Sequence, residues 1–420
     1  MSEATQEAVS TSPPATWSQK TFASLSHRQF RFFWISNLIV SVGLMVQFVA
    51  RGWMVVQITD SALVLGAVEG TWAVAFALGS IPMGLAADRF NRRNLLVLGS
   101  FLALLAAVVV AILIVTDVIA IWHLLIAGAV TGVLFAMRVP AGQAMTARLV
   151  PPKNLMNAIS LNQTAHSLPN VAGPAAGGIL IAVAGIAGAY FVTSGAFFLG
   201  LLLILGVSAS FGAIQRTTQA KSVKQDLGEA IDYLREHKDL LQLTAAMLIP
   251  FILGQSYVLL LPLFVEQELG LGPEAFGALS ACLGAGAVVG GLSVATFGEE
   301  RQIGLLMFLG VLGTGVAAVA YGLSESVYLT GAVLFVAGAG ESALFASYDT
   351  LLLMRLPDEI RGRVMGLMFT LVAMFPIGAI GAGAAADIVG LRTVAIVEGT
   401  IIIAMSYLAW RTVFRRAVAR

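Results

Sequence analysis

Residues 84–115 read GLAADRFNRRNLLVLGSFLALLAAVVVAILIV, and they decide the class of fold. Their first ten positions hold one acid and three arginines, whereas residues 95–115 carry no charge. An α-helix needs about 20 apolar residues to cross the hydrocarbon core of a bilayer. The stretch is therefore predicted to be a polar turn at a membrane surface, followed by a membrane-spanning helix.

The composition of the whole chain points the same way. Of its 420 residues, 58% are hydrophobic and 11% are charged, and the mean hydropathy is +0.89. This apolar content suffices for about a dozen spans. A net charge of +1 gives no basic surface for nucleic acid, and the single cysteine, Cys282, can form neither an internal disulfide nor a multi-thiolate metal site. We predict an all-α polytopic membrane protein without a cofactor.

Apolar runs between charged, Pro and Gly punctuation predict twelve transmembrane helices in two bundles of six. The spans lie near residues 31–58, 62–87, 95–115, 119–146, 156–183, 187–211, 240–265, 275–297, 302–323, 327–350, 361–386 and 391–413. The predicted regions are a disordered tail (1–29), a first bundle (30–211), a linker with an amphipathic helix (212–239), a second bundle (240–413) and a basic tail (414–420). The linker is interpreted as a tether, with a regulatory docking site as the alternative.

The basic residues predict the orientation of the spans. If both termini are cytoplasmic, all 24 Lys and Arg except Arg51, Arg138 and Arg392 fall in cytoplasmic segments, which leaves 21 on that side. Cytoplasmic loops of membrane proteins carry such an excess of Lys and Arg. A multi-pass protein of the cell membrane with both termini in the cytoplasm is expected.

The two halves resemble each other at a fixed offset. Val150-Pro151-Pro152 precedes the fifth predicted span, and Leu356-Pro357-Asp358 precedes the eleventh, 206 positions later. Repeated halves of this kind permit alternating access, in which two similar bundles rock about a site near the middle of the bilayer. The repeat therefore favours a transporter.

The turn after the second span carries a specific motif. Gly84, Asp88, Arg89, Arg92 and Arg93 fit the pattern G-x-x-x-D-R-x-G-R-R, with Asn91 where that pattern has glycine. This resembles the loop signature of the major facilitator superfamily, and asparagine also tolerates a left-handed turn. The resemblance implies a twelve-helix fold in which the second span ends near the start of the eleventh.

A second motif lies in the fifth span, at Gly173-Pro174-Ala175-Ala176-Gly177-Gly178. On physical grounds it predicts close helix packing through small residues. It also resembles the G-P-x-x-G-G core associated with exporters and proton antiporters of the same superfamily, where it bends the helix at the interface between the halves. The resemblance favours export over import.

Three further stretches resemble the enterobactin-exporter-like subgroup, which includes macrolide-efflux-type proteins. They are Asp60-Ser61, Pro262-Leu263 with Leu269-Gly270 and Gly277, and Arg361-Gly362-Arg363-Val364. The resemblance implies a twelve-helix exporter driven by the proton gradient. It also suggests that Asp88, Arg89, Arg92 and Arg93 form a cytoplasmic latch that stabilises the outward-open state. In this latch Asp88 meets the start of the eleventh span, where the helix dipole and Arg361 or Arg363 favour a carboxylate.

Ionisable residues within spans are candidates for function, because a charge is costly in a membrane. Glu341, near the middle of the tenth span, is the candidate proton site, and Arg138, in the fourth span, is the charge that would respond to it. A fixed Arg138–Glu341 ion pair and a packing role are the alternatives.

Arg51 and Glu69 should both lie about 10 Å below the outer surface at 1.5 Å per residue, so they are predicted to pair, either structurally or beside the substrate path. Glu398 receives no role.

The other candidate pathway residues are polar side chains within the spans: Asn37, Gln47, Asn162, His166, Gln255, Tyr257 and Asp349. His166 is expected to be a packing residue more readily than a titrating one, and Asp349 a solvated gate residue. Nearby aromatic side chains suit a bulky, partly apolar solute.

Rival functions are weighed by the motifs they require. The chain lacks a G-x-S-x-G elbow, an H-E-x-x-H pair and a Walker sequence, so neither an enzyme nor direct use of ATP is predicted. The prediction is a monomeric, proton-coupled exporter of an amphiphilic drug-like compound or siderophore. A lipid facilitator of the same fold and a non-transporting sensor are the alternatives.

Overall fold

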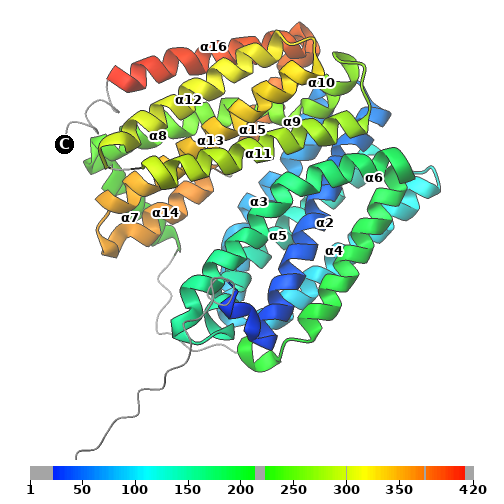
Figure 1. Ribbon diagram of the computed structural model, residues 1–420, viewed down its shortest axis with the longest axis vertical. Helices are drawn as coiled ribbons and strands as arrows, with labels where there is room; N and C mark the ends of the chain where they lie inside the picture. The colour runs from blue at the N-terminus through cyan, green and yellow to red at the C-terminus, as the bar shows by residue number, and fades with distance from the viewer. Residues whose placement is uncertain (1–21, 213–222, 299, 373–374, 412–420) are drawn as a thin grey trace, which may run out of the picture.

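The computed structural model describes residues 22–212, 223–298, 300–372 and 375–411, which form helices and connecting loops without a strand among them (Figure 1). The N-terminal half contains η1 (Ala23–Ser26), α2 (Arg28–Ile58), α3 (Ala62–Arg89), α4 (Arg92–Val115), α5 (Ile121–Leu149), η2 (Pro152–Asn154), α6 (Leu155–Leu205) and η3 (Ala209–Gly212). The C-terminal half contains α7 (Val223–Glu236), α8 (Lys238–Gly254), α9 (Ser256–Leu259), α10 (Leu261–Gln267), α11 (Pro273–Phe297), α12 (Glu300–Gly322), α13 (Val327–Arg355), α14 (Asp358–Val372), α15 (Phe375–Val389) and α16 (Leu391–Ala409).

The predicted all-α membrane class is confirmed. Ten segments among the described residues are long and apolar enough to cross a bilayer. One of them includes the whole of α6, which holds the fifth and sixth predicted spans, while α14 and α15 share the eleventh. The count of twelve spans therefore depends on taking α6 as two helices and α14 with α15 as one.

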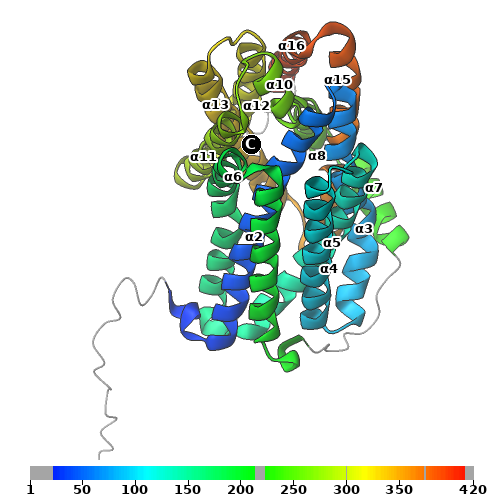
Figure 2. The ribbon, with the colours of Figure 1, turned by 90° about the vertical axis from the view of Figure 1, so that its right-hand side faces the viewer.

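The long helix α6 folds back on itself at Gly185, where φ is +72°. Glycine adopts this backbone conformation without the steric cost that a Cβ atom brings. Ser36 and Asn37 are adjacent in α2, yet Ser36 donates a hydrogen bond to the Gly200 carbonyl and Asn37 donates one to Asn162. Residues 162 and 200 therefore lie at a similar depth. The hairpin of α6 can be followed in Figure 2.

Side-chain caps define where α3 and α4 begin. The hydroxyl of Ser61 accepts a hydrogen bond from the Val64 amide at 3.3 Å, and the side-chain oxygen of Asn91 accepts from the amides of Arg93 and Asn94. The backbone of Asn91 has φ −59°, so the left-handed conformation that asparagine tolerates is not adopted here. Asparagine serves here as an N-cap, which satisfies amides at the start of the helix.

One face of α4 is suited to lipid. Leu98, Phe101, Leu105, Val109 and Ile112 recur at helical spacing and are about half exposed. Soluble proteins rarely expose apolar stripes of this size. The stripe therefore identifies the side of the first half that contacts the bilayer.

Three boundaries differ from the sequence prediction. Residues 22–29 were assigned to a disordered tail, but the buried Ser24 donates its amide to Asn157 and fixes η1 to α6. The seventh predicted span is interrupted at Gln255 and Leu260, where prolines nearby remove backbone donors. The sixth ends at Leu205 rather than residue 211. Residues 1–21 and 414–420, which complete the two predicted tails, lie outside the described part of the chain.

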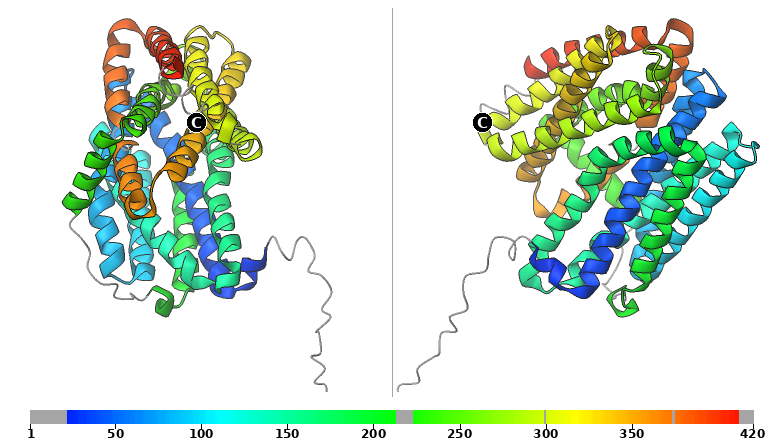
Figure 3. Two further views of the ribbon diagram at one scale, coloured as in Figure 1. Left: turned by 90° about the vertical axis from the view of Figure 1, so that its left-hand side faces the viewer. Right: turned by 45° about the vertical axis from the view of Figure 1, so that its right-hand side comes forward.

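The halves contact each other mainly through α3 with α15 and α6 with α11. We call the end of the molecule where α2 begins the terminal face, and the end where α3 begins the opposite face. The contacts of Gly66 with Ala379, Gly383 with Ala62 and Gly178 with Gly277 lie toward the opposite face, and the contact between α6 and α11 continues to Asn170 and Gly284 at the middle of α11. The views of Figure 3 show the two groups of helices inclined to one another.

Candidate functional site

The cavity between the halves has an aromatic wall. Trp72, Phe76 and Phe135 form a cluster with ring centroids 5.5–5.7 Å apart. Two of these rings line a cavity of about 800 Å³ that extends from α2, α3 and α5 to Leu259 in the second half. Gln47, a predicted pathway residue, also lines this cavity. Such a wall accommodates an apolar ring system.

Arg51 and Glu69 form the ion pair that the sequence predicts. Arg51 Nε lies 3.1 Å from Glu69 Oε1, and Nη2 lies 2.5 Å from Oε2. The arginine side chain is 5% exposed and the glutamate side chain 2%. A bidentate pair compensates both buried charges, so this arginine is already neutralised by a residue of its own half.

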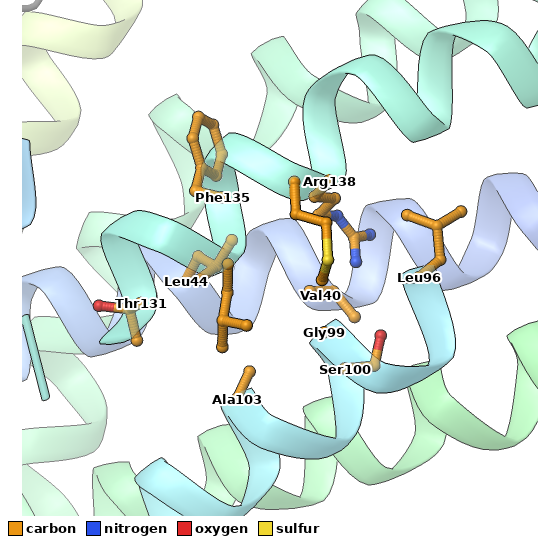
Figure 4. Close-up of a pocket in the computed structure, with 11 residues that line it drawn as sticks. Val40, Leu44, Leu96, Gly99, Ser100, Ala103, Thr131, Phe135 and Arg138 are labelled. Atoms are coloured by element: carbon orange, nitrogen blue, oxygen red, sulfur yellow. The ribbon is translucent and has the colours of Figure 1, made fainter. Parts of the chain in front are cut away.

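Arg138 has a different environment. It donates a hydrogen bond from Nη2 to Asn37 Oδ1 at 2.6 Å, while Asn37 Nδ2 donates to Asn162 Oδ1 at 3.0 Å. The buried Arg138 Nε has no hydrogen-bond partner. Among the described side chains, no carboxylate forms an ion pair with Arg138. Figure 4 shows its guanidinium beside Val40 and Leu96 in a largely apolar pocket.

Glu341 lies in the second half, on α13, and accepts a hydrogen bond from Gln255 at the interruption of the seventh span. No described cation pairs with Glu341, and the fixed Arg138–Glu341 ion pair considered from the sequence does not form in this conformation. Tyr257 is buried, and its ring is tilted by 45° against that of Tyr321 with the ring centroids 5.3 Å apart. The first half thus holds an arginine and the second half a carboxyl group, each hydrogen-bonded to a side chain of its own half.

The remaining candidates are spread over the molecule. Asp349 is exposed toward the terminal end of α13, apart from the polar pairs just described. The side chains of His166 and Asp88 lie outside those that the structure describes.

The basic residues of the loop motif make contacts within their own halves. Arg92 donates to the Ala87 carbonyl, and Arg93 donates to the carbonyls of Val207 and Leu205. In the other half, Arg361 donates to the Leu353 and Leu356 carbonyls, and Arg363 pairs with Glu229 of α7. Arg89 is exposed, and a Cβ at Gly84 would have no atom within 4 Å. The amphipathic α7 is thereby attached to the start of α14.

The glycines of the fifth-span motif allow helices to approach closely. Gly173 and Gly177 face Met45 and Val49 of α2. Gly178 faces the second half, where a Cβ would lie 2.5 Å from the Pro273 carbonyl oxygen and 2.9 Å from Gly277 Cα. The Pro174 carbonyl in turn approaches Gly277. The motif therefore packs α6 against both α2 and α11.

We predict that Gly178→Val weakens the contact between the halves. Overpacking of this kind costs roughly 1–3 kcal/mol, so conformations in which α6 and α11 separate become more populated. The reporter is a cysteine at Gln143, which is exposed and lines the cavity, in a Cys282→Ser background. Its labelling by an impermeant maleimide from the terminal face should slow several-fold. Gly195→Val is the matched control, because a Cβ there meets nothing within 4 Å; equal labelling in both variants would contradict the prediction.

One inter-half contact was not predicted from the sequence. Asp387, at the end of α15, accepts hydrogen bonds from Ser61 Oγ at 2.7 Å and from the Ala62 and Leu63 amides at 2.6 and 3.3 Å. A carboxylate at a helix N-terminus is favoured by the unpaired amides and by the helix dipole. In the sequence, Asp60-Ser61 was identified only as a feature shared with the family. The signal that could have revealed the contact is Ser61 as the N-cap of α3, because the first amides of a helix can bind an acid.

Two further acids, Asp60 and Glu266, lie close to this contact. Partial burial raises the pKa of Glu266 in α10, and the nearby carboxylate of Asp60 raises it further. The side chain of Gln267 also donates to the Asp60 carbonyl across the halves at 3.3 Å. Acid at this face would protonate Glu266 and reduce its repulsion with Asp60, which favours contact between the halves.

Comparisons with known proteins agree with this architecture. Residues 19–418 match the family described as transmembrane secretion effector, a family of the major facilitator superfamily. The chain is 24% identical to the multidrug efflux pump Tap of Mycolicibacterium fortuitum over 84% of its length and 88% of that protein. It is 25% identical to the enterobactin exporter EntS of Shigella flexneri over 81% of both chains. A crystal structure of a bacterial homologue of the lysosomal transporter Spinster, inward-facing and unoccupied, has the same fold, with a TM-score of 0.74 at 16% identity over 93% of this chain and 98% of that one.

Proposed function

Because the chain belongs to the transmembrane secretion effector family of the major facilitator superfamily, we propose that it exports a bulky, amphiphilic small molecule in exchange for protons. The protein is a multi-pass membrane transporter of the efflux type and not an enzyme. Proton coupling, the substrate class, the monomeric state and the orientation in the membrane are parts of the proposal. The terminal face is taken as cytoplasmic because of the excess of Lys and Arg there.

The observation that carries the proposal is the position of Glu341. Its carboxyl group lies in the second half, hydrogen-bonded to Gln255, and no cation among the described residues compensates it. An isolated carboxylate is costly in a membrane protein interior, whereas the protonated acid is not. Glu341 can thus bind a proton when the cavity faces outward and release it when the cavity faces the cytoplasm, with Arg138 as the charge that responds.

The cavity supports the amphiphilic substrate class. Its aromatic wall is close to the polar groups of Gln47, Asn37 and Asn162, so one molecule could make apolar and polar contacts together. The relatives named as a multidrug efflux pump and an enterobactin exporter are consistent with solutes larger than a simple sugar. This combination favours a drug-like or siderophore-like molecule.

Two latches at opposite ends of α3 would exchange during alternating access. At the opposite face, Asp387 binds the first turn of α3 in this conformation. At the terminal face, we propose that Asp88 binds the start of α14 in the alternative conformation, aided by Arg89, Arg92 and Arg93. Both latches would join the second and eleventh spans, so closing one face would release the other.

We predict that Asp387→Ala shifts the equilibrium toward the conformation that opens at the opposite face. Loss of charge-assisted hydrogen bonds costs about 1.5–3 kcal/mol, which is a change of at least about tenfold in the ratio of conformations. Labelling of the Gln143→Cys reporter from the terminal face should slow accordingly. Asp117→Ala, in the exposed loop after α4, is the control. Unchanged labelling in Asp387→Ala would show that these hydrogen bonds do not hold the face closed.

Reconstitution tests the function directly. Proteoliposomes with an imposed pH gradient are challenged with siderophores, macrolides and lysolipids, and proton movement is recorded with a pH-sensitive dye. Proton movement that depends on one solute is expected. Movement of lysolipid alone would favour the lipid facilitator, and solute movement that is indifferent to the pH gradient would refute proton coupling.

A further inference from the structure

The two arginines within the spans have contrasting partners. Arg51 is held by both oxygens of Glu69 in a buried bidentate pair. Arg138 binds only the neutral side-chain oxygen of Asn37, and its buried Nε has no hydrogen-bond partner. Arginine remains protonated in proteins, so it cannot avoid the cost of burial by losing its proton. A positive charge in the cavity wall therefore lacks a carboxylate among the described residues.

The surroundings of Arg138 hold it in place for a ligand. Asn162 binds the amide nitrogen of Asn37, which directs the oxygen of Asn37 toward Arg138. This contact occupies Nη2 and leaves Nε without a partner beside the pocket of Figure 4. A guanidinium with a free donor of this kind matches a carboxylate, sulfonate or phosphate group.

The apolar part of a ligand has a defined place next to this charge. Thr131, Phe135 and Arg138 follow the spacing i, i+4 and i+7, so they lie along one stripe of α5. Phe135 lines the pocket of Figure 4, the cavity beside Arg51 and Glu69 and the cavity of Gln143, and it belongs to the aromatic cluster with Trp72. Phe135 and Arg138 are three residues apart on α5, which places them about 4.5 Å apart along the helix axis at 1.5 Å per residue. An aromatic ring bearing an acidic group spans such a distance.

We propose that Arg138 is the binding site for the negatively charged group of the substrate, and that the transported class is aromatic or amphiphilic organic anions. This inference rests on the proposed export function and narrows its substrate class. In the exchange, Glu341 carries the proton on the second half while Arg138 holds the anion on the first. The two charges then do not need to contact each other directly.

The test uses a pair of probes that differ only in charge. Pyrenecarboxylate is anionic at neutral pH, whereas pyrenecarboxamide has the same ring system and is neutral. Binding to the purified full-length protein in detergent is measured by fluorescence anisotropy, with protein-free micelles subtracted. The wild-type protein should bind the anion at least about tenfold more tightly, as expected for a charge-assisted contact, and added salt should reduce the difference.

The variants distinguish the loss of the positive charge at position 138 from damage to the fold. Arg138→Gln should bind the two probes equally, and its retained binding of the neutral amide shows that the cavity is intact. Arg138→Lys should keep part of the preference. Arg235→Gln removes a positive charge from the exposed face of α7 and should behave as wild type. Equal binding of the two probes by the wild-type protein, or an undiminished preference in Arg138→Gln, would overturn the proposal.

Because binding is measured without a gradient, its outcome is independent of transport. Anion binding at Arg138 in a protein that moves no solute would refute the export function and leave the anion site standing. Proton-driven export of a solute by a protein without the anion preference would refute the anion site and support the export function.

Discussion

Glu341→Gln is expected to abolish proton-driven accumulation of substrate. Glutamine has nearly the shape of protonated glutamic acid and can still contact Gln255, but it carries no proton through the cycle. Uphill transport should fall by at least about tenfold, to the level of empty liposomes, since intramembrane carboxyl groups are the usual carriers of coupled protons. Exchange of solute down its own gradient should persist. The measurement is substrate flux in proteoliposomes, with and without a pH gradient.

The controls distinguish coupling from damage to the fold. Glu341→Asp retains an ionisable group and should recover part of the coupled flux. Glu325→Gln removes an acid from an exposed loop and should leave the flux unchanged. Coupled transport by Glu341→Gln with the pH dependence of the wild-type protein would assign the proton to another residue.

Glu69→Gln is expected to cause the largest loss of stability among single substitutions in the cavity wall. It leaves the buried Arg51 charge without its bidentate partner. Breaking a buried pair from one side typically costs about 3–5 kcal/mol, because the remaining charge stays in a low-dielectric environment. The apparent melting temperature of the purified protein, followed by thiol-reactive dye at Cys282, should fall clearly.

The double variant Arg51→Gln/Glu69→Gln tests this reason. With both charges removed, much of the lost stability should return, since no uncompensated charge remains. If the double variant regains stability but transports poorly, the pair also belongs to the substrate path. A Glu69→Gln protein as stable as the wild type would show that water already solvates Arg51.

Much of the architecture could be predicted from local sequence. Hydropathy and length located the ends of most spans within a few residues, because an apolar run has to match the thickness of a bilayer. The break in the seventh span was harder to predict from the sequence, although Pro250 and Pro262 flank it. The capping role of Asn91 was not predicted, because it depends on the start of α4, which the motif alone does not define.

The contacts of the site were predicted correctly where the depth of two residues in the membrane was enough to define them as partners. Arg51 and Glu69 pair as expected from their similar distances to the membrane surface. The same reasoning did not reveal that Gln255 binds Glu341, or that Asn37 lies between Arg138 and Asn162. Those contacts depend on how each helix is rotated about its own axis. Because most of these helices have apolar residues on all sides, the sequence pattern hardly defines this rotation.

The sequence by itself determined that this chain is a helical membrane protein and a major facilitator, and it identified the few charges placed within the spans. Only the tertiary structure decided which charges are compensated, so that Arg51 is neutralised and Arg138 is not. It also brought Asp387 to the start of α3, 325 residues away along the chain. Hydropathy is a local property that each segment carries alone, whereas the partner of a buried charge depends on how distant helices pack and on which face of the transporter is closed.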